Sequence, residues 1–263
     1  MKHLFFSSLV FLACSPGETT EPLESNNSDV VKPVIVIHGG AGNISRANIP
    51  DSMAVLYTQA LNTALEVGNT ILNNNGTALE AVEATIRIME DNPLFNAGKG
   101  SVLNMKGEVE NDASIMDGTT LKAGAVSGVQ GVKNPISLAR LVKDSTKHVM
   151  LSGEGANQFA LEMQVDTASQ DYFITERKRA YYQKLINKKF GTVGCVALDK
   201  QGNIAAGTST GGMMMKKWGR VGDSPIIGAG TYANSHFAGV SCTGHGEYFI
   251  KNVVAYDVIA LME

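Results

Sequence analysis

The sequence has little cysteine and little charge of either sign. Its three cysteines among 263 residues cannot make a disulfide framework, and no Cys/His spacing predicts a zinc site. Charged residues make up 18% of the chain, the net charge is -3, and the basic residues are scattered, so no nucleic-acid-binding face is predicted. Cys195 and Cys242 lie in apolar runs, where buried side chains are expected rather than catalytic thiols. The 44% of hydrophobic residues is enough for a full globular core.

The first 31 residues follow an export pattern. Lys2 precedes an apolar run over 4–12, which is too short to span a bilayer. The four residues ending at Cys14 resemble a bacterial lipoprotein box, which predicts a signal peptide over 1–13, lipidation of Cys14 and a solvated tether over 14–31. An ordinary cleaved signal or a fortuitous apolar start is the alternative. We expect an exported protein, either periplasmic or anchored to the membrane by a lipid.

The hydrophobic pattern predicts layered α and β elements. The β-branched run at 34–37 predicts a buried central strand that ends in a glycine loop. Helical periodicity over 51–72 predicts one helix, and a capping box at 77–80 begins another that ends before Pro93. Further strands are expected at 123–129, 148–151, 193–198, 203–208 and 236–242, and further helices at 134–142 and 247–262. Turn residues between 193–198 and 203–208 predict an antiparallel hairpin. Sheets between helix layers are the simplest arrangement.

Thr192 stands between glycines at the start of that hairpin, directly after a polar segment over 164–190. This segment predicts a removable linker, although an exposed helix fits the same pattern. If the peptide bond before Thr192 is broken, the residue presents a hydroxyl nucleophile together with a free α-amine whose near-neutral pKa suits a general base. By itself the pattern is weak, since a threonine that begins a strand is usually only a β-branched residue.

Six further motifs follow a fixed order. They are HGGAG at 38–42, NPLFNAG at 92–98, MDG at 116–118, TSTGGM at 208–213, GRVGDSP at 219–225 and SCTGHGE at 241–247. With Thr192 they resemble the plant-type L-asparaginases, also called isoaspartyl (β-aspartyl) peptidases, of the N-terminal-nucleophile (Ntn) hydrolase superfamily. The resemblance covers about residues 33–263. It implies an α+β fold, namely a four-layer αββα sandwich, and a precursor that cuts itself between Gly191 and Thr192.

The resemblance also implies roles in the reaction. Thr192 is the nucleophile, and Thr210 holds its hydroxyl and amine, although a plain strand-end threonine is the alternative for Thr210. Thr243 and Gly244 are the oxyanion donors, and Asn96 lies near the nucleophile. Acyl transfer through Thr192 needs no cofactor.

Substrate binding is implied at three further positions. Arg220 would bind the α-carboxylate, and Asp223 the α-ammonium, with help from Gly244 and the carbonyl of Gly246. A surface ion pair between Arg220 and Asp223 is the alternative. The implied substrates are L-asparagine and β-aspartyl dipeptides, and the product is L-aspartate. A glycosylasparaginase-like amidase and an inactive lipoprotein or binding module of the same fold are the competing interpretations.

The resemblance finally implies a structural sodium ion and a homodimer of self-cleaved αβ units. Main-chain carbonyls would bind the sodium ion. They belong to Met89, Glu90, Asn92, Phe95, Ala97 and Lys99. The α part of the hydrolase domain would span 32–191, and the β part 192–263. Because the family continues past the position of Glu263, we expect the C-terminal strands of the sandwich to be missing, which would weaken folding, self-cleavage and activity.

Overall fold

The structure is a computed structural model that describes residues 31–41, 49–184 and 191–263. The predicted signal peptide, the tether with Cys14, Gly42 and the last residues of the predicted linker lie outside these ranges. Residues 31–263 form one unit. Within the described ranges, no helix has the length and apolar character needed to cross a membrane.

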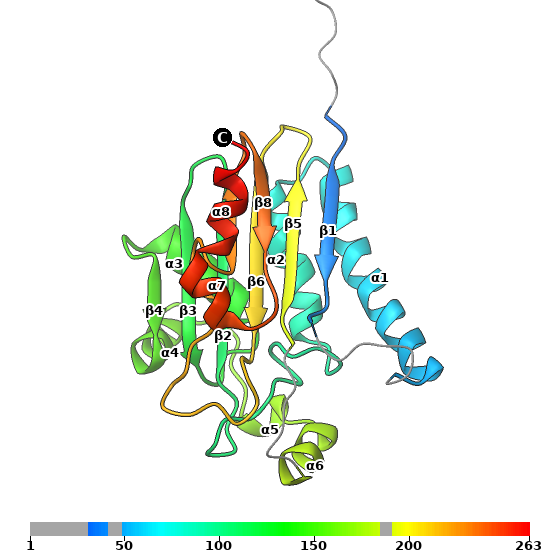
Figure 1. Cartoon of the computed structure of the whole chain (residues 1–263), viewed down its shortest axis with the longest axis vertical. Helices are drawn as coiled ribbons and strands as arrows, with labels where there is room; N and C mark the ends of the chain where they lie inside the picture. Colours follow the sequence, from blue (N-terminus) through cyan, green and yellow to red (C-terminus); the bar gives the residue numbers. More distant parts are fainter. Residues whose placement is uncertain (1–30, 42–48, 185–190) are drawn as a thin grey trace, which may run out of the picture. The chain divides into compact units, whose positions relative to one another are not determined.

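A six-stranded sheet is the centre of the fold (Figure 1). Its order is β1-β5-β6-β2-β3-β4, and all neighbours are antiparallel except β3 and β4. The strands are β1 Val34–His38, β2 Asn111–Asp117, β3 Ala123–Val129, β4 Met150–Ser152, β5 Val193–Leu198 and β6 Ile204–Thr210. The predicted hairpin of β5 and β6 is confirmed, with Val193 opposite Ser209.

Three helices cover one face of this sheet. They are α1 Asp51–Asn73 on β1, α2 Ala78–Glu90 on β5 and β6, and α3 Pro135–Ser145 on β2 and β3. The predicted capping box is confirmed, since the Thr77 hydroxyl accepts from the Glu80 N–H and the Glu80 carboxylate accepts from the Thr77 N–H. Three shorter helices lie farther along the chain, α4 Gly153–Glu162, α5 Gln170–Phe173 and α6 Glu176–Lys184.

The opposite face is covered by a two-stranded sheet of β7 Thr231–Asn234 and β8 Ala238–Ser241, which contacts β2, β5 and β6. The helices α7 Gly246–Asn252 and α8 Val254–Ala260 follow, and α8 packs on β7 and β8. The prediction of one helix over 247–262 is therefore wrong. The chain turns at Val253, which has a left-handed φ of 49°, because the N–H groups of Ala255 and Tyr256 bond to the carbonyls of Ala229 and Gly228.

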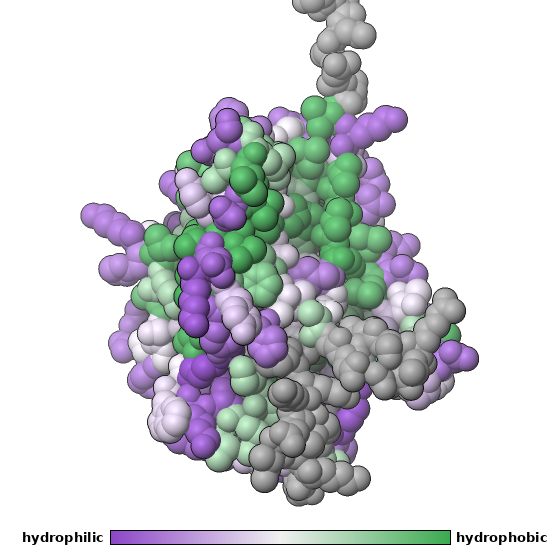
Figure 2. All heavy atoms as spheres, in the orientation of Figure 1, coloured by the Kyte–Doolittle hydropathy of each residue, from purple (hydrophilic) through white to green (hydrophobic). Residues whose placement is uncertain are grey.

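Strand β1 lies at the edge of the sheet, so the prediction of a buried central strand is also wrong. Val34 and Val36 are 52% and 63% exposed, while Ile35 and Ile37 pack against the core. Figure 2 shows this apolar surface along β1. The β-branched run identified a strand correctly, but its place in the sheet depends on tertiary pairing that a local pattern does not encode.

The first part of the predicted linker packs against the protein. Thr167 forms a β-bridge with Val132, the Gln170 side chain bonds to both main-chain groups of Val109, and Phe173 is fully buried. Any segment that is removed without disturbing this packing would lie closer to Thr192. The removable linker itself stays a prediction.

Candidate active site

Thr192 is placed by the alternation of side chains along β5. Val193, Cys195 and Ala197 point toward the helices and join the apolar core, so Thr192 lies on the opposite face. The β5–β6 register puts it opposite Thr210. Its side chain is buried, and its hydroxyl donates a hydrogen bond of 3.2 Å to Thr210 Oγ1. The predicted contact between these two threonines is therefore present.

Two donors hold the carbonyl group of the Gly191–Thr192 peptide bond. Asn96 Nδ2 lies 2.6 Å from the Gly191 oxygen, and Thr210 Oγ1 lies 2.9 Å from it. The Thr210 hydroxyl donates its one proton to this carbonyl. It accepts hydrogen bonds from the Thr192 hydroxyl and the Gly212 N–H. Both donors can stabilise the carbonyl oxygen if it gains charge during attack by the Thr192 hydroxyl.

The Asn96 side chain is fixed at both ends. Its Oδ1 accepts from the Val102 N–H at 2.8 Å, and its Nδ2 also donates to the Gly212 carbonyl at 2.9 Å. The accepting role of Oδ1 sets the orientation of the amide, so Nδ2 must face Gly191. Asn96 thus joins the loop after α2 to the Gly191–Thr192 peptide bond.

The glycine loop after β1 lies against the backbone of Thr192. A Cβ at Gly40, which has a φ of 110°, would lie 2.8 Å from the Thr192 nitrogen and 2.9 Å from its oxygen, so only glycine fits. The next residue, Ala41, donates its N–H to Thr243 Oγ1 at 3.0 Å. The loop therefore connects Thr192, the predicted nucleophile, to one of the two predicted oxyanion donors. The other, Gly244, follows in the loop before α7.

A chain of hydroxyl groups runs from His38 into the space between the two sheets. His38 Nε2 lies 3.2 Å from Ser241 Oγ, which lies 2.7 Å from Thr208 Oγ1. Thr231 Oγ1 donates to Thr208 at 2.6 Å and accepts from Ser114 Oγ at 2.8 Å. Sequence reasoning missed this hydroxyl chain. Its four hydroxyl residues come from four different strands, so no local pattern signals the chain.

His38 is the one titratable group in the hydroxyl chain. Burial lowers its pKa, while main-chain hydrogen bonds with Thr192 and Ser241 act in the opposite direction. Gly194 of β5 lies between the partners, and a Cβ there would fall 2.0 Å from Ser241 Oγ. The imidazole therefore packs against Gly194, two residues after Thr192 on β5.

The predicted head-group residues lie close together, but Arg220 and Asp223 do not pair with each other. Arg220 bonds to the Glu247 carboxylate through Nε at 3.0 Å and Nη2 at 2.9 Å. Asp223 is 5% exposed, and its Oδ2 has no hydrogen-bond partner among the described residues. Burial raises the pKa of Asp223. Gly246 packs on the same carboxylate, since a Cβ there would lie 2.7 Å from Oδ1. An unpartnered buried carboxylate suits a cationic ligand.

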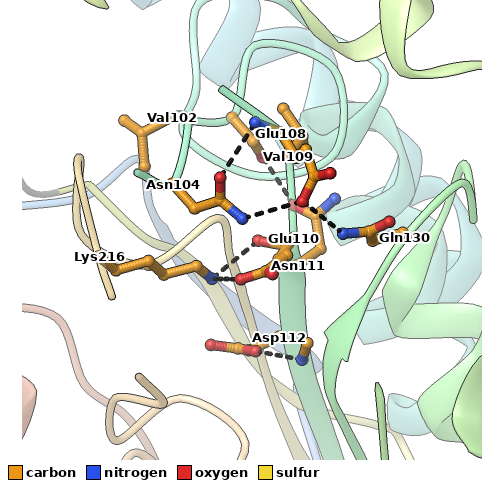
Figure 3. Close-up of polar contacts among 12 residues, drawn as sticks. Val102, Asn104, Glu108, Val109, Glu110, Asn111, Asp112, Gln130 and Lys216 are labelled. Atoms are coloured by element: carbon orange, nitrogen blue, oxygen red, sulfur yellow. Dashed lines mark hydrogen bonds and ion pairs between the residues drawn. The ribbon is translucent and has the colours of Figure 1, made fainter. Parts of the chain in front are cut away.

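Two more buried charges lie beside this region (Figure 3). Asp112, opposite Thr210 on β2, accepts from the Gly128 N–H at 2.8 Å, and its Oδ2 has no partner in the described part of the chain. Burial raises its pKa. Lys216 Nζ lies 3.1 Å from the Glu110 carbonyl and 3.6 Å from its carboxylate. Sequence reasoning missed these residues and Glu247, because none stands out within the motifs by residue type alone.

The loop proposed for sodium supplies oxygen donors of the right kind. Three of the six predicted carbonyls, those of Met89, Glu90 and Asn92, accept one main-chain hydrogen bond each and keep a second lone pair. The Glu90 side chain is fully buried with one orphaned oxygen, and burial raises its pKa to about 8. No group of three His, Cys, Asp or Glu side chains suited to a metal occurs among the residues described. Main-chain carbonyls fit a hard cation, and the sodium site stays a prediction.

Both thiols in the described ranges are unsuited to catalysis, as predicted. Cys195 and Cys242 are buried, and burial raises their pKa values to about 12 and about 11. A thiol with such a pKa carries almost no thiolate at neutral pH.

Comparison with known proteins identifies relatives of one family. The profile of a family described as asparaginase matches residues 31–187 and 178–263. An isoaspartyl peptidase of Salmonella typhimurium is 47% identical over 251 residues, covering 88% of this chain and 79% of the relative. The isoaspartyl peptidase of Escherichia coli is 46% identical, with 88% and 77% covered, and an isoaspartyl peptidase/L-asparaginase of Homo sapiens is 48% identical, with 84% and 74% covered. The chain therefore belongs to the asparaginase family.

Proposed function

We propose that this chain is a self-cleaving threonine amidohydrolase that hydrolyses β-aspartyl dipeptides and L-asparagine and releases L-aspartate. The observation that carries the proposal is that Asn96 and Thr210 both donate hydrogen bonds to the Gly191 carbonyl, next to the Thr192 hydroxyl. The relatives described above are named isoaspartyl peptidases, some of them also L-asparaginases, which supports the same chemistry.

Self-cleavage begins when Thr192 Oγ attacks the Gly191 carbonyl carbon. The C–O bond forms, the negative charge collects on the Gly191 oxygen between Asn96 and Thr210, and the C–N bond then breaks. The hydroxyl proton passes to the departing nitrogen, which becomes the α-amine of Thr192. Water hydrolyses the resulting ester, leaving a Gly191 carboxylate and a free N-terminal Thr192.

Turnover uses the two groups that cleavage creates on Thr192. The α-amine takes the hydroxyl proton while Oγ attacks the side-chain carbonyl of the substrate, and Thr243 with the Gly244 N–H stabilises the oxyanion. The proton is then given to the leaving amine, which is ammonia from asparagine or an amino acid from a dipeptide. Water attacks the acyl-Thr192 ester and releases L-aspartate.

Selectivity would come from the amino acid head group. Arg220 offers its remaining donors to the α-carboxylate, and the orphaned Asp223 oxygen accepts from the α-ammonium. Fixing both groups leaves only the side-chain amide to reach Thr192, so α-linked peptides are excluded. The lone negative charge of Asp223 favours a free ammonium over an acylated nitrogen.

The packing supports a four-layer αββα arrangement. The six-stranded sheet packs against helices α1 to α3 on one face and against the β7–β8 pair on the other, and α8 packs on the outside of that pair. In this arrangement Thr192 lies where the two sheets meet. We infer as well that the 89–99 loop holds a sodium ion and that the self-cleaved units pair as a dimer.

A substrate comparison tests the proposal. Purified protein is assayed for ammonia release from L-asparagine and for cleavage of β-aspartyl-leucine, with α-aspartyl-leucine as the negative substrate and Thr192→Ala as the control. Hydrolysis of the first two alone, lost in the variant, is expected. Equal cleavage of the α-linked peptide, or full activity of Thr192→Ala, contradicts the assignment.

A further inference from the structure

A cavity borders the loop that carries Arg220. It has a volume of about 490 Å³ and lies between the turn after Leu103 and the segment that leads to Arg220. The lining residues are Asn104, Met105, Lys106, Glu110, Lys216, Lys217, Trp218 and Gly219. None of these has a role in the mechanism proposed above.

This cavity lies next to the residues that contact Thr192 and the Gly191 carbonyl. Lys216 passes close to Gly212, where a Cβ would lie 3.4 Å from the lysine Cδ and 3.3 Å from its Nζ. The N–H and carbonyl of Gly212 bond to Thr210 and Asn96, the two residues that hold the Gly191 carbonyl. Gly219 at the other end directly precedes Arg220. A substrate that extends past the attacked carbonyl would therefore find this cavity next to it.

The most exposed large side chain of the cavity wall is Trp218. This residue, the only tryptophan of the chain, is 97% exposed and has a φ of 53°, a backbone conformation that bulky residues rarely adopt. Met105 adds an apolar side chain that is 43% exposed. Exposed aromatic and thioether side chains at the edge of a cavity are typical of ligand contact.

The charges of the lining favour an anion. Three lysines and one glutamate line the cavity, but the ammonium of Lys216 is turned to Glu110 (Figure 3). Lys106 and Lys217 form no ion pair with any residue the structure describes, and Lys217 Nζ lies 5.5 Å from the Trp218 ring centre. Two cations beside an apolar surface match the α-carboxylate and side chain of an amino acid.

We propose that this cavity is the subsite for the leaving amino acid of a β-aspartyl dipeptide. Its side chain lies against Trp218 and Met105, and its carboxylate faces Lys106 and Lys217. The proposal rests on the proposed function and extends it, because it assigns a preference for dipeptides with an apolar or aromatic second residue. L-Asparagine releases only ammonia and leaves the subsite empty.

That difference makes asparagine an internal control. Steady-state kinetics of Trp218→Ala are measured with β-aspartyl-phenylalanine, β-aspartyl-glycine and L-asparagine. We expect kcat/KM to fall about tenfold for the phenylalanine dipeptide and less than about twofold for asparagine, with glycine between them. Leu161→Ala, which truncates an exposed side chain on α4, is the matched control and should change neither reaction.

A second comparison tests the proposed contact between the dipeptide carboxylate and the two lysines. A Lys106→Gln, Lys217→Gln double variant should lose about fivefold in kcat/KM for β-aspartyl-phenylalanine and be unchanged for the same dipeptide with an amidated C-terminus. Equal losses of Trp218→Ala on dipeptide and asparagine, or no loss on either, would overturn the subsite while the proposed function stands. Wild-type protein that hydrolyses none of these substrates would overturn the proposed function first, and the subsite with it.

Discussion

The two faces of the six-stranded sheet are formed by the same strands but differ in chemistry, one being apolar and the other rich in hydroxyl groups. Toward the helices, alternate residues such as Ile115, Val193 and Cys195 pack into an apolar core. Toward β7 and β8, the intervening positions place Thr192, Thr208 and other hydroxyl groups in hydrogen bonds. Because side chains alternate along a strand, one sequence can specify a packed face and a reactive face at once.

This difference predicts that substitutions on the two faces have different effects. Substitutions on the helix face should lower the free energy of unfolding and leave the chemistry of folded molecules intact. Substitutions near Thr192 should lower self-cleavage or turnover with little effect on stability. The reason is that self-cleavage and turnover depend on the geometry of hydrogen bonds between buried hydroxyl groups, and even a small change of side-chain shape disturbs that geometry.

Outside Thr192 itself, the largest effect is expected for Thr210→Val. The variant loses the hydroxyl that donates to the Gly191 oxygen and accepts from Thr192, so self-cleavage should slow by roughly 10²–10³-fold. The rate is followed by gel electrophoresis of freshly purified protein. Thr85→Val, the same change at a fully buried threonine of α2, should cleave at the wild-type rate. Equal slowing in both variants would remove the distinction between the faces.

Ile86→Ala tests the helix face. Its fully buried side chain belongs to the apolar core, so truncation should cost about 2–5 kcal/mol of unfolding free energy. Urea unfolding measures the loss, and cleavage per folded molecule should stay unchanged. Ile86→Val should cost only about 0.5–1.5 kcal/mol. A stable Ile86→Ala protein that fails to cleave itself would contradict the assignment of this face to packing.

Arg220→Lys tests how finely the head-group site is built. The lysine keeps the positive charge but loses the planar fork, so KM for L-asparagine should rise roughly tenfold while kcat changes little. Arg140→Lys is the matched control, because Arg140 pairs with Glu83 and Asp144 on the helix side. A fall in kcat without a change in KM would place Arg220 in the chemistry instead of in binding.

His38→Gln should have the smallest effect, visible as a change in pH dependence. The pKa of His38 is lowered in the folded protein, so the unfolded chain binds more protons below about pH 6.5. Wild-type stability should therefore fall as the pH drops below about 6.5, with this one group contributing no more than about 1.4 kcal/mol per pH unit. Urea unfolding at pH 5.5 and 7.5 should show a smaller difference for His38→Gln. An identical difference would show that His38 titrates normally.

Local patterns predicted many of the elements, and the family resemblance supplied the candidate site residues. The capping box at Thr77 and the β5–β6 hairpin follow from short-range spacing, whereas the contact of Thr192 with Thr210 was implied by the family resemblance. Strands β2 and β7 and helix α4 were not predicted. In β2, Asp112 and Ser114 interrupt the apolar pattern because they lie on the polar face. Asn111 interrupts it because its side chain bonds to Ser101 and to the Gly98 N–H, so the strand lacks its usual hydrophobic signature.

Pairings between distant segments could not be predicted. The edge position of β1, the break at Val253 and the ion pair of Arg220 with Glu247 each depend on where another segment lies. The cavity beside Trp218 likewise joins two loops that are far apart in sequence. Such features are set by tertiary contacts, which a single sequence encodes only through the whole fold.

The central claim is that Thr192 gains its reactivity by becoming an N-terminus. The most direct measurement is the mass of purified protein under denaturing conditions, for the wild type and for Thr192→Ala. We predict two wild-type fragments, the second beginning at Thr192, and one intact chain for the variant. A folded wild-type protein that stays whole, or a variant that is cut at the same bond, would contradict the claim.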